Sequence, residues 1–99
     1  MKKLFVSQPM NGKSDDEILK ERKYLIAKAQ ACTGEALEVL DTFFVNAPAD
    51  AKPLWYLGES LKYVAMADFA VFALDWSKAR GCRIEHAAAE EYGIPTMEA

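Results

Sequence analysis

Short apolar runs alternate along this chain with longer segments in which apolar residues recur at helical spacing. The runs predict four strands, over residues 4–6, 36–40, 69–74 and 95–97. The third run is apolar at every position, which is typical of a parallel strand that is covered on both faces. Each run ends in turn-forming or polar residues, so the strands are expected to be short.

The segments between these runs predict three helices. The first opens with the capping-box pattern that begins at Ser14 and has Glu17 three residues later, and Gly34 ends it. The second covers residues 55–67, after a loop over 46–53, and the third covers residues 82–92. Regular alternation of strands and helices predicts an α/β fold of the Rossmann-like or flavodoxin-like kind, with three layers and a parallel sheet of four or five strands.

Composition and charge narrow the class of protein. A chain of 99 residues, of which 52% are hydrophobic, predicts one domain over residues 1–99 with a real core. The net charge of −3 gives no basic footprint, so a nucleic-acid polymer is not an expected partner. The widely separated Cys32 and Cys82 and the single His86 do not form a metal-binding pattern, and we expect neither a metal nor a cofactor. No segment resembles a membrane span or a signal peptide, which predicts a cytoplasmic protein without a membrane partner.

Two carboxylates are predicted to meet at one edge of the sheet. Asp75 follows the third predicted strand, and Glu85 stands in the first turn of the helix that comes next. In open α/β sheets, ligands bind outside the carboxyl ends of the strands, next to helix N-termini. The pair is therefore a candidate for chemistry. The alternative is that both carboxylates cap a helix or complement its dipole.

Two polar loops follow the first and third strands, and they would flank the same crevice. Such loops can offer backbone N–H groups, hydroxyls and cations to a phosphate. Trp76, beside Asp75, is a candidate for covering a sugar or a base. The alternatives are a plain turn for the first loop and a solvated surface loop for the second. The candidate binding residues in the two loops are Ser7, Gln8, Pro9, Met10, Gly12, Ser77, Lys78, Arg80 and Gly81.

Four motifs, in order along nearly the whole chain, resemble the nucleoside 2-deoxyribosyltransferase superfamily, and most closely its short bacterial and phage branch. Phe5-Val6-Ser7-Gln8-Pro9-Met10 resembles its first strand and loop. Ala67-Asp68 precedes an apolar strand that ends at Asp75, as in that family. Gly81-x-x-x-Glu85 is similar to its glycine-to-nucleophile spacing, and Tyr92-Gly93-Ile94-Pro95 to the end of its last helix.

The resemblance implies cleavage or transfer of the N-glycosidic bond in a nucleoside or nucleoside 5'-monophosphate. Glu85 would attack the anomeric carbon and form a covalent glycosyl-enzyme. A second acid would protonate the departing base. The register of the family's acid falls on Ser60 in this chain, so the adjacent Glu59 is the candidate, unless the acid is absent. Gln8 replaces a usual glycine, and a usual serine before Gly81 is missing.

Two other functions remain open on the sequence alone. One is a nucleotide-binding module without catalysis on the same fold, since a fold does not fix an activity. The other is a protein-interaction subunit. We also expect a homodimer or a higher homo-oligomer, because a chain of this length buries a limited core and carries large apolar residues outside its strands. The helix predicted over 55–67 is the expected contact.

Overall fold

The computed structural model describes residues 1–42 and 47–99, so the first residue of the loop predicted over 46–53 lies outside the described part. The four strands of its sheet are β1 (Lys2–Ser7), β2 (Leu37–Val39), β3 (Phe69–Phe72) and β4 (Thr96–Glu98). The α-helices in the described part are α1 (Asp15–Thr33), α2 (Pro53–Met66) and α3 (Arg80–Glu91), and η1 (Trp76–Lys78) is a 3-10 turn. Within the described ranges, no helix has the length and apolar character that a bilayer crossing requires.

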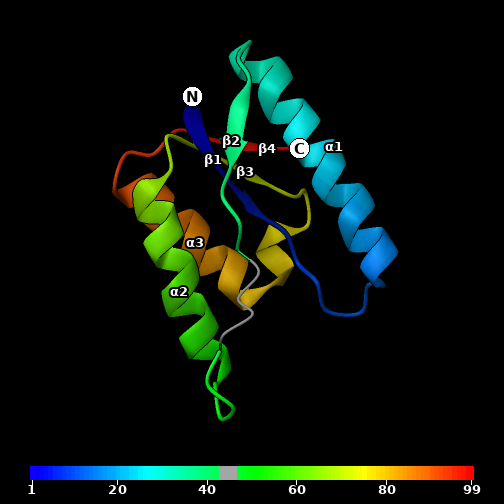
Figure 1. Cartoon of the computed structure of the whole chain (residues 1–99), viewed down its shortest axis with the longest axis vertical. Coiled ribbons are helices and arrows are strands. Elements are labelled where there is room, and N and C mark those ends of the chain that lie inside the picture. Colours follow the sequence, from blue (N-terminus) through cyan, green and yellow to red (C-terminus); the bar gives the residue numbers. More distant parts are fainter. Residues whose placement is uncertain (43–46) are drawn as a thin grey trace.

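The strands form one parallel sheet in the order β2-β1-β3-β4, which confirms the predicted α/β fold. Helix α1 covers one face of the sheet, and α2 and α3 cover the other (Figure 1). The chain leaves β1 toward one neighbour and later returns to form β3 on its other side. Ser7 and Phe72 are paired at the carboxyl ends of these two central strands. In open α/β sheets, ligand-binding crevices form where the strand order reverses in this way. In this sheet the reversal lies between β1 and β3.

Each face of the sheet has its own hydrophobic cluster, because successive side chains of a strand point to opposite faces. In β1, Leu4 and Val6 point toward α1, and Phe5 points toward α2 and α3. Beside α1 the buried members are Leu4, Val6, Leu25, Ala29, Leu37, Val71 and Ala73. Beside α2 and α3 they are Phe5, Leu40, Val64, Ala70, Phe72 and Ala89.

The helix ends show how local sequence sets the boundaries. The capping box of Ser14 and Glu17 is present, and Gly34 ends α1 with a φ of 69°, as predicted. Helix α2 begins two residues earlier than predicted, because Pro53 occupies its first turn, where its missing N–H costs no hydrogen bond. Helix α3 also begins two residues early, at Arg80.

The predicted strand over 69–74 is too long at its end. Pairing with β1 stops where the N–H of Ala73 donates to the carbonyl of Ser7, and the chain then turns into η1. Leu74 is consequently 77% exposed, although it continues the apolar run. The run is thus longer than the strand, because β1 ends at Ser7 and offers no further partner.

Candidate functional site

Glu85 is the centre of the candidate site. It lies on α3, its side chain is buried with 9% exposed, and it faces the carboxyl ends of β1 and β3. The Oγ of Ser7, the last residue of β1, donates a hydrogen bond of 2.7 Å to its Oε1. Ser60, on α2, forms a second side-chain hydrogen bond to the same carboxylate. Three separate elements therefore hold one carboxylate in place.

The surroundings of Glu85 act on its charge in two directions. Burial raises the pKa of this carboxyl, because the ionised form loses its hydration. The hydrogen bonds from Ser7 and Ser60 oppose that effect, but the pKa stays above its ordinary value. The two hydrogen bonds therefore do not fully replace the hydration that the ionised carboxylate of Glu85 has lost. A positive charge that develops next to this carboxylate would be stabilised by it.

A cavity of about 240 Å³ opens beside Glu85. Five of the sequence-predicted residues come together here: Gln8, Pro9, Met10, Gly81 and Glu85. The remaining walls come from α2 and from the start of α3, namely Pro53, Tyr56, Leu57, Ser60, Ala79 and Cys82. Among the described residues that line this cavity, Glu85 is the one acidic side chain.

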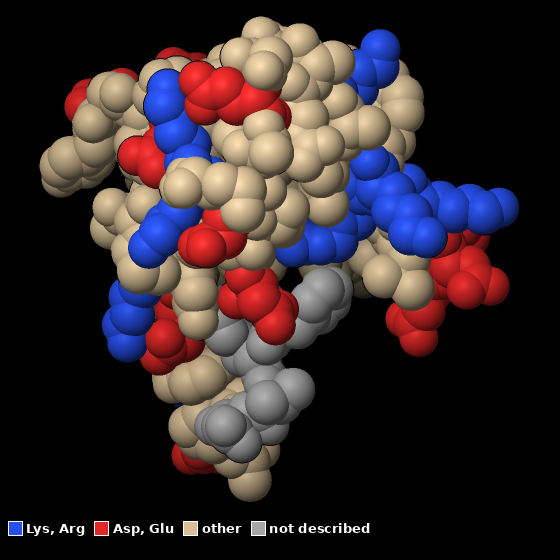
Figure 2. All heavy atoms as spheres, turned by 45° about the horizontal axis from the view of Figure 1, so that its top comes forward, with Lys and Arg blue, Asp and Glu red and all other residues tan. Residues whose placement is uncertain are grey.

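A second cavity, of about 750 Å³, adjoins the first and shares Pro9, Ala79 and Gly81 with it. Four cationic side chains and one carboxylate line it, together with Asn11: the charged residues are Lys13, Lys78, Arg80, Arg83 and Asp75. Because cations outnumber carboxylates in this concave lining, the cavity is suited to an anion. Over the face of the molecule that Figure 2 shows, acidic and basic side chains are interspersed.

Asp75 lines this cationic cavity and not the cavity of Glu85. Its Oδ2 lies 3.1 Å from the Nζ of Lys13, which also lies 3.1 Å from the Oε1 of Glu21. Burial alone would lower the pKa of Lys13, but its hydrogen bonds to Asp75 and Glu21 raise it. Asp75 therefore ties the loop after β1 to the end of β3, and its charge is matched by a cation.

The structure does not bring Glu59 or Trp76 to either cavity. The carboxylate of Glu59 pairs with Lys62 at 3.1 Å on the surface of α2. The indole of Trp76 stacks on the ring of His86, with centroids 3.8 Å apart and planes 3° apart. Its Nε1 donates to Glu98 of β4. These partners hold Trp76 against α3, away from the place predicted for a ligand.

Gly12 and Ser77 also lie outside the residues that line the two cavities. Gly12 has a φ of 78° and makes the turn before α1. The carbonyl of Ser77 accepts a hydrogen bond of 2.8 Å from Arg83, which is one of the cations of the second cavity. Gly12 and Ser77 therefore contribute to the site through the shape of the loops that carry them.

Sequence reasoning missed several residues that the fold adds to the site. The cationic cavity also includes Asn11, Lys13 and Arg83. The sequence around a surface side chain does not indicate which cavity that side chain will line. Cys82 lines the cavity of Glu85, and burial raises the pKa of its thiol, which therefore keeps its proton. The amide of Gln8 donates to Glu21 at 2.9 Å and to the carbonyl of Ile18 at 3.2 Å. Gln8 thus fixes the first loop against α1.

Comparisons with known proteins bear on the fold. No family model matches this chain, and a search of curated proteins found no match. The crystal structure of a conserved protein from Enterococcus faecalis V583 is similar over 99% of this chain, with a TM-score of 0.70 and 19% sequence identity. The chain spans about 62% of the length of that protein. The likeness shows a shared Rossmann-like architecture.

Proposed function

We propose that this protein cleaves or transfers the N-glycosidic bond of a nucleoside or nucleoside 5'-monophosphate, with Glu85 as the nucleophile. One observation carries the proposal. A carboxylate is buried beside a cavity at the reversal of strand order, and two serine hydroxyls orient it. The motifs that resemble the nucleoside 2-deoxyribosyltransferase superfamily place their nucleophile at this same residue.

The chemistry suits an incompletely compensated carboxylate. An oxygen of Glu85 bonds to the anomeric carbon, while the bond from that carbon to the base nitrogen breaks and its electron pair leaves with the base. The transition state resembles an oxocarbenium ion, so a nearby negative charge stabilises it. Water or a second base then attacks the anomeric carbon and releases Glu85. Hydrolysis and transfer differ only in this second step.

The two adjoining cavities suit the two ends of a nucleoside 5'-monophosphate. The sugar would lie beside Glu85, and the phosphate beside Lys78 and Arg80 in the cationic cavity. Charge-assisted hydrogen bonds from such cations are about twice as strong as neutral ones. A phosphate held there would also fix the position of the anomeric carbon relative to the carboxylate.

Protonation of the departing base must come from a group other than a second carboxylate of this cavity. In the described lining of the Glu85 cavity, Tyr56 and Cys82 carry protons that a leaving base could accept. The absence of an acidic partner from that lining favours the second candidate function, a nucleotide-binding module without turnover. We propose glycosidic cleavage first because the burial of Glu85 is a cost that binding alone does not explain.

Release of free base tests the proposal. The protein is incubated with a panel of nucleosides and their 5'-monophosphates, and the free base is measured by chromatography. We expect release by the unaltered protein and a loss of about 10³-fold or more in Glu85→Gln. Glu38→Gln, the same change at an exposed position of β2, is the control and should leave release unchanged. Binding of a monophosphate by calorimetry without any release of base would contradict cleavage and support the binding module.

A further inference from the structure

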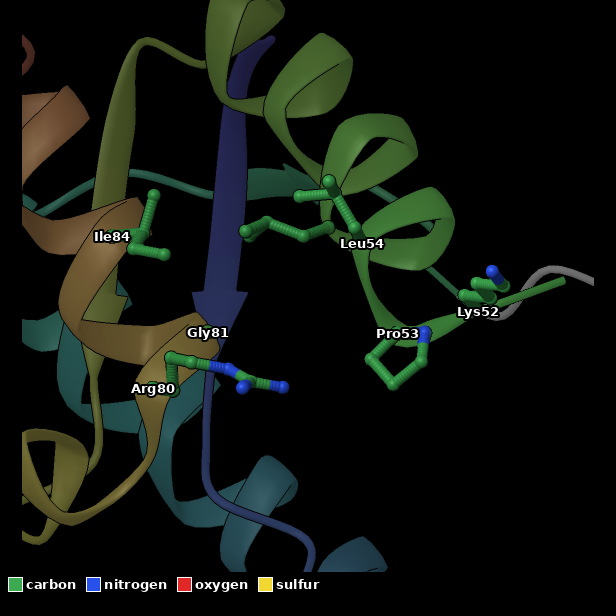
Figure 3. A pocket seen from close by; sticks show the side chains of 7 residues that line it. Lys52, Pro53, Leu54, Arg80, Gly81 and Ile84 are labelled. Carbon is green, nitrogen blue, oxygen red and sulfur yellow. The ribbon is translucent and has the colours of Figure 1, made fainter.

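Helix α3 presents different side chains on opposite sides. On one side, Arg80 extends toward Pro53 of α2, and Ile84 lines the same cavity of about 430 Å³ (Figure 3). His86 follows Ile84 by two residues, so its side chain leaves the helix about 200° around the axis from that of Ile84. His86 contacts η1 and β4 instead, and only 7% of it is exposed. The reaction proposed for Glu85 does not use this buried titratable group.

The imidazole of His86 lies between an aromatic ring and two carboxylates. It stacks on the indole of Trp76, as described above. Its Nδ1 lies 3.0 Å from Oε1 of Glu90, one turn later on α3, and its Nε2 lies 3.5 Å from Oε1 of Glu98 on β4. The edge of Phe72, on β3, completes the surroundings, with ring centroids 4.7 Å apart. We call His86, Trp76, Glu90 and Glu98 the His86 cluster.

The number of protons on His86 decides which contacts of the cluster can form. A neutral imidazole has one N–H, and the shorter distance assigns it to Nδ1, which donates to Glu90. The lone pair of Nε2 then faces Oε1 of Glu98, so two acceptors repel each other. An imidazolium donates from both nitrogens and is also favoured by the indole face beneath it. Cys82, one turn before His86, adds no charge, because burial raises the pKa of its thiol.

We propose that proton uptake by His86 attaches β4 to α3, with Glu98 as the carboxylate that the second N–H binds. When the ring is neutral, Glu98 accepts a hydrogen bond from the indole of Trp76 but none from His86. When the ring is charged, Glu98 bridges both rings. The contact with Glu90 joins two residues of one helix, so it forms in either state. The His86 cluster is therefore a pH-sensitive contact between the last strand and the rest of the fold.

The pH range of this contact follows from the groups that form it. Histidine side chains ordinarily titrate near about pH 6.5 and glutamates near about pH 4.3, so the charged ring meets ionised carboxylates between these values. The contact with Glu98 is complete in that range and is lost as the pH rises above it. Burial of His86 opposes its charge, and the side chains of Glu90 and Glu98 are 60% and 48% exposed, so water screens the pairs. The effect on stability is therefore moderate.

The His86 cluster also holds one wall of the cationic cavity. Trp76 is the first residue of η1, and Asp75 and Lys78, which lie at the two ends of this turn, both line that cavity. The stack on His86 and the hydrogen bond to Glu98 therefore fix the turn that carries Lys78. The cluster itself does not depend on the reaction proposed for Glu85, so the two are tested separately.

Double-mutant cycles measured by urea unfolding test the proposal. His86→Phe keeps an aromatic ring beside Trp76 and removes both nitrogens, and it is combined in turn with Glu98→Gln and Glu90→Gln. At about pH 5.5 the coupling of His86 with Glu98 should change the unfolding equilibrium constant about fivefold, and at about pH 8 it should vanish. The coupling with Glu90 should persist at both values. Glu91→Gln, at an exposed residue of α3, is the control and should not couple. An equal coupling of His86 with Glu98 at both values, or none at either, would overturn the proposal.

Proton NMR tests the same contact without any change at His86, in case His86→Phe does not fold. The chain has one histidine, so the imidazole C–H signals report its protonation directly. In Glu98→Gln the ring should bind its proton about fivefold more weakly than in the unaltered protein, because proton binding and attachment of β4 are linked. Glu91→Gln should titrate as the unaltered protein does. The same titration in Glu98→Gln and the unaltered protein would overturn the role of Glu98.

Discussion

The Oγ of Ser7 donates a hydrogen bond of 2.7 Å to the carboxylate of Glu85, although 78 positions separate the two residues in the chain. Ser7 ends the central strand β1, and Glu85 lies in the second turn of α3. Their contact exists because β1 and β3 are neighbours and α3 follows β3. The strand order of the sheet therefore assembles the candidate site.

Removal of the Ser7 hydroxyl should alter the titration of Glu85. In Ser7→Ala the carboxylate loses a hydrogen bond that favours its ionised form, so its pKa rises further. If Glu85 is the nucleophile, the acidic limb of the pH–rate profile moves to higher pH. The free energy of unfolding at neutral pH should also fall by about 1–2 kcal/mol. Ser77→Ala, at an exposed serine, is the control; identical profiles for Ser7→Ala and the unaltered protein would contradict the assignment.

Glu85→Gln should be more stable than the unaltered protein, and the difference in the free energy of unfolding should grow as the pH rises from acid to neutral. The pKa of Glu85 is higher in the folded state than its ordinary value, so the folded protein binds more protons than the unfolded chain in the window between the two. The free energy of unfolding therefore falls as pH rises through that window. Glutamine has no charge to bury, so its advantage grows with pH. Urea unfolding over a pH series measures this, and a less stable Glu85→Gln at neutral pH would show that the ionised carboxylate is well compensated.

Gly81→Ala should keep the stability of the fold and weaken ligand binding at the site. A Cβ at Gly81 would meet no atom within 4 Å, and alanine favours a helix by about 0.5–1 kcal/mol, so α3 should be as stable or more stable. Gly81 lines both cavities of the site, and a methyl group there should weaken binding of a nucleoside monophosphate. Gly34→Ala provides the opposite case, because its φ of 69° makes alanine destabilising by about 1 kcal/mol. Calorimetric binding and thermal unfolding of both variants measure the two effects.

Nucleoside monophosphates should bind more tightly than the matching nucleosides. The cationic cavity supplies Lys78 and Arg80 to a phosphate, and loss of either cation should reduce the affinity for the monophosphate by about tenfold, with a smaller effect on the nucleoside. Lys28→Ala, on the outer surface of α1, is the control. Equal affinities for nucleoside and monophosphate would show that this cavity does not hold a phosphate.

The alternation of apolar runs with helical segments was sufficient to predict the parallel sheet and to place Glu85 near the carboxyl ends of its central strands, but it placed Glu85 one turn too early in α3 and in one crevice with Asp75. It did not predict the end of β3, because the length of a strand depends on where its neighbour ends; β1 ends at Ser7, so Leu74 is left in solvent. The role of Trp76 was hidden for a similar reason. Its partners His86 and Glu98 come from α3 and β4, and no local pattern joins them.

The residue of α2 that faces the site is Ser60, one position after the predicted acid Glu59. Neighbouring residues of an α-helix point about 100° apart, so the side chains of Glu59 and Ser60 leave α2 in different directions. The structure turns Ser60 toward Glu85 and leaves Glu59 with Lys62 on the surface. Sequence spacing locates a helix face only to within about a residue, which is too coarse for this distinction.

Mass spectrometry of the intact protein, quenched during reaction with a nucleoside 5'-monophosphate, tests the central claim most directly. If Glu85 attacks the anomeric carbon, a fraction of the protein gains the mass of the sugar phosphate without the base. Fragmentation should place that mass on Glu85, and Glu85→Gln should show none. Release of base without any adduct, or an adduct on another side chain, would contradict Glu85 as the nucleophile.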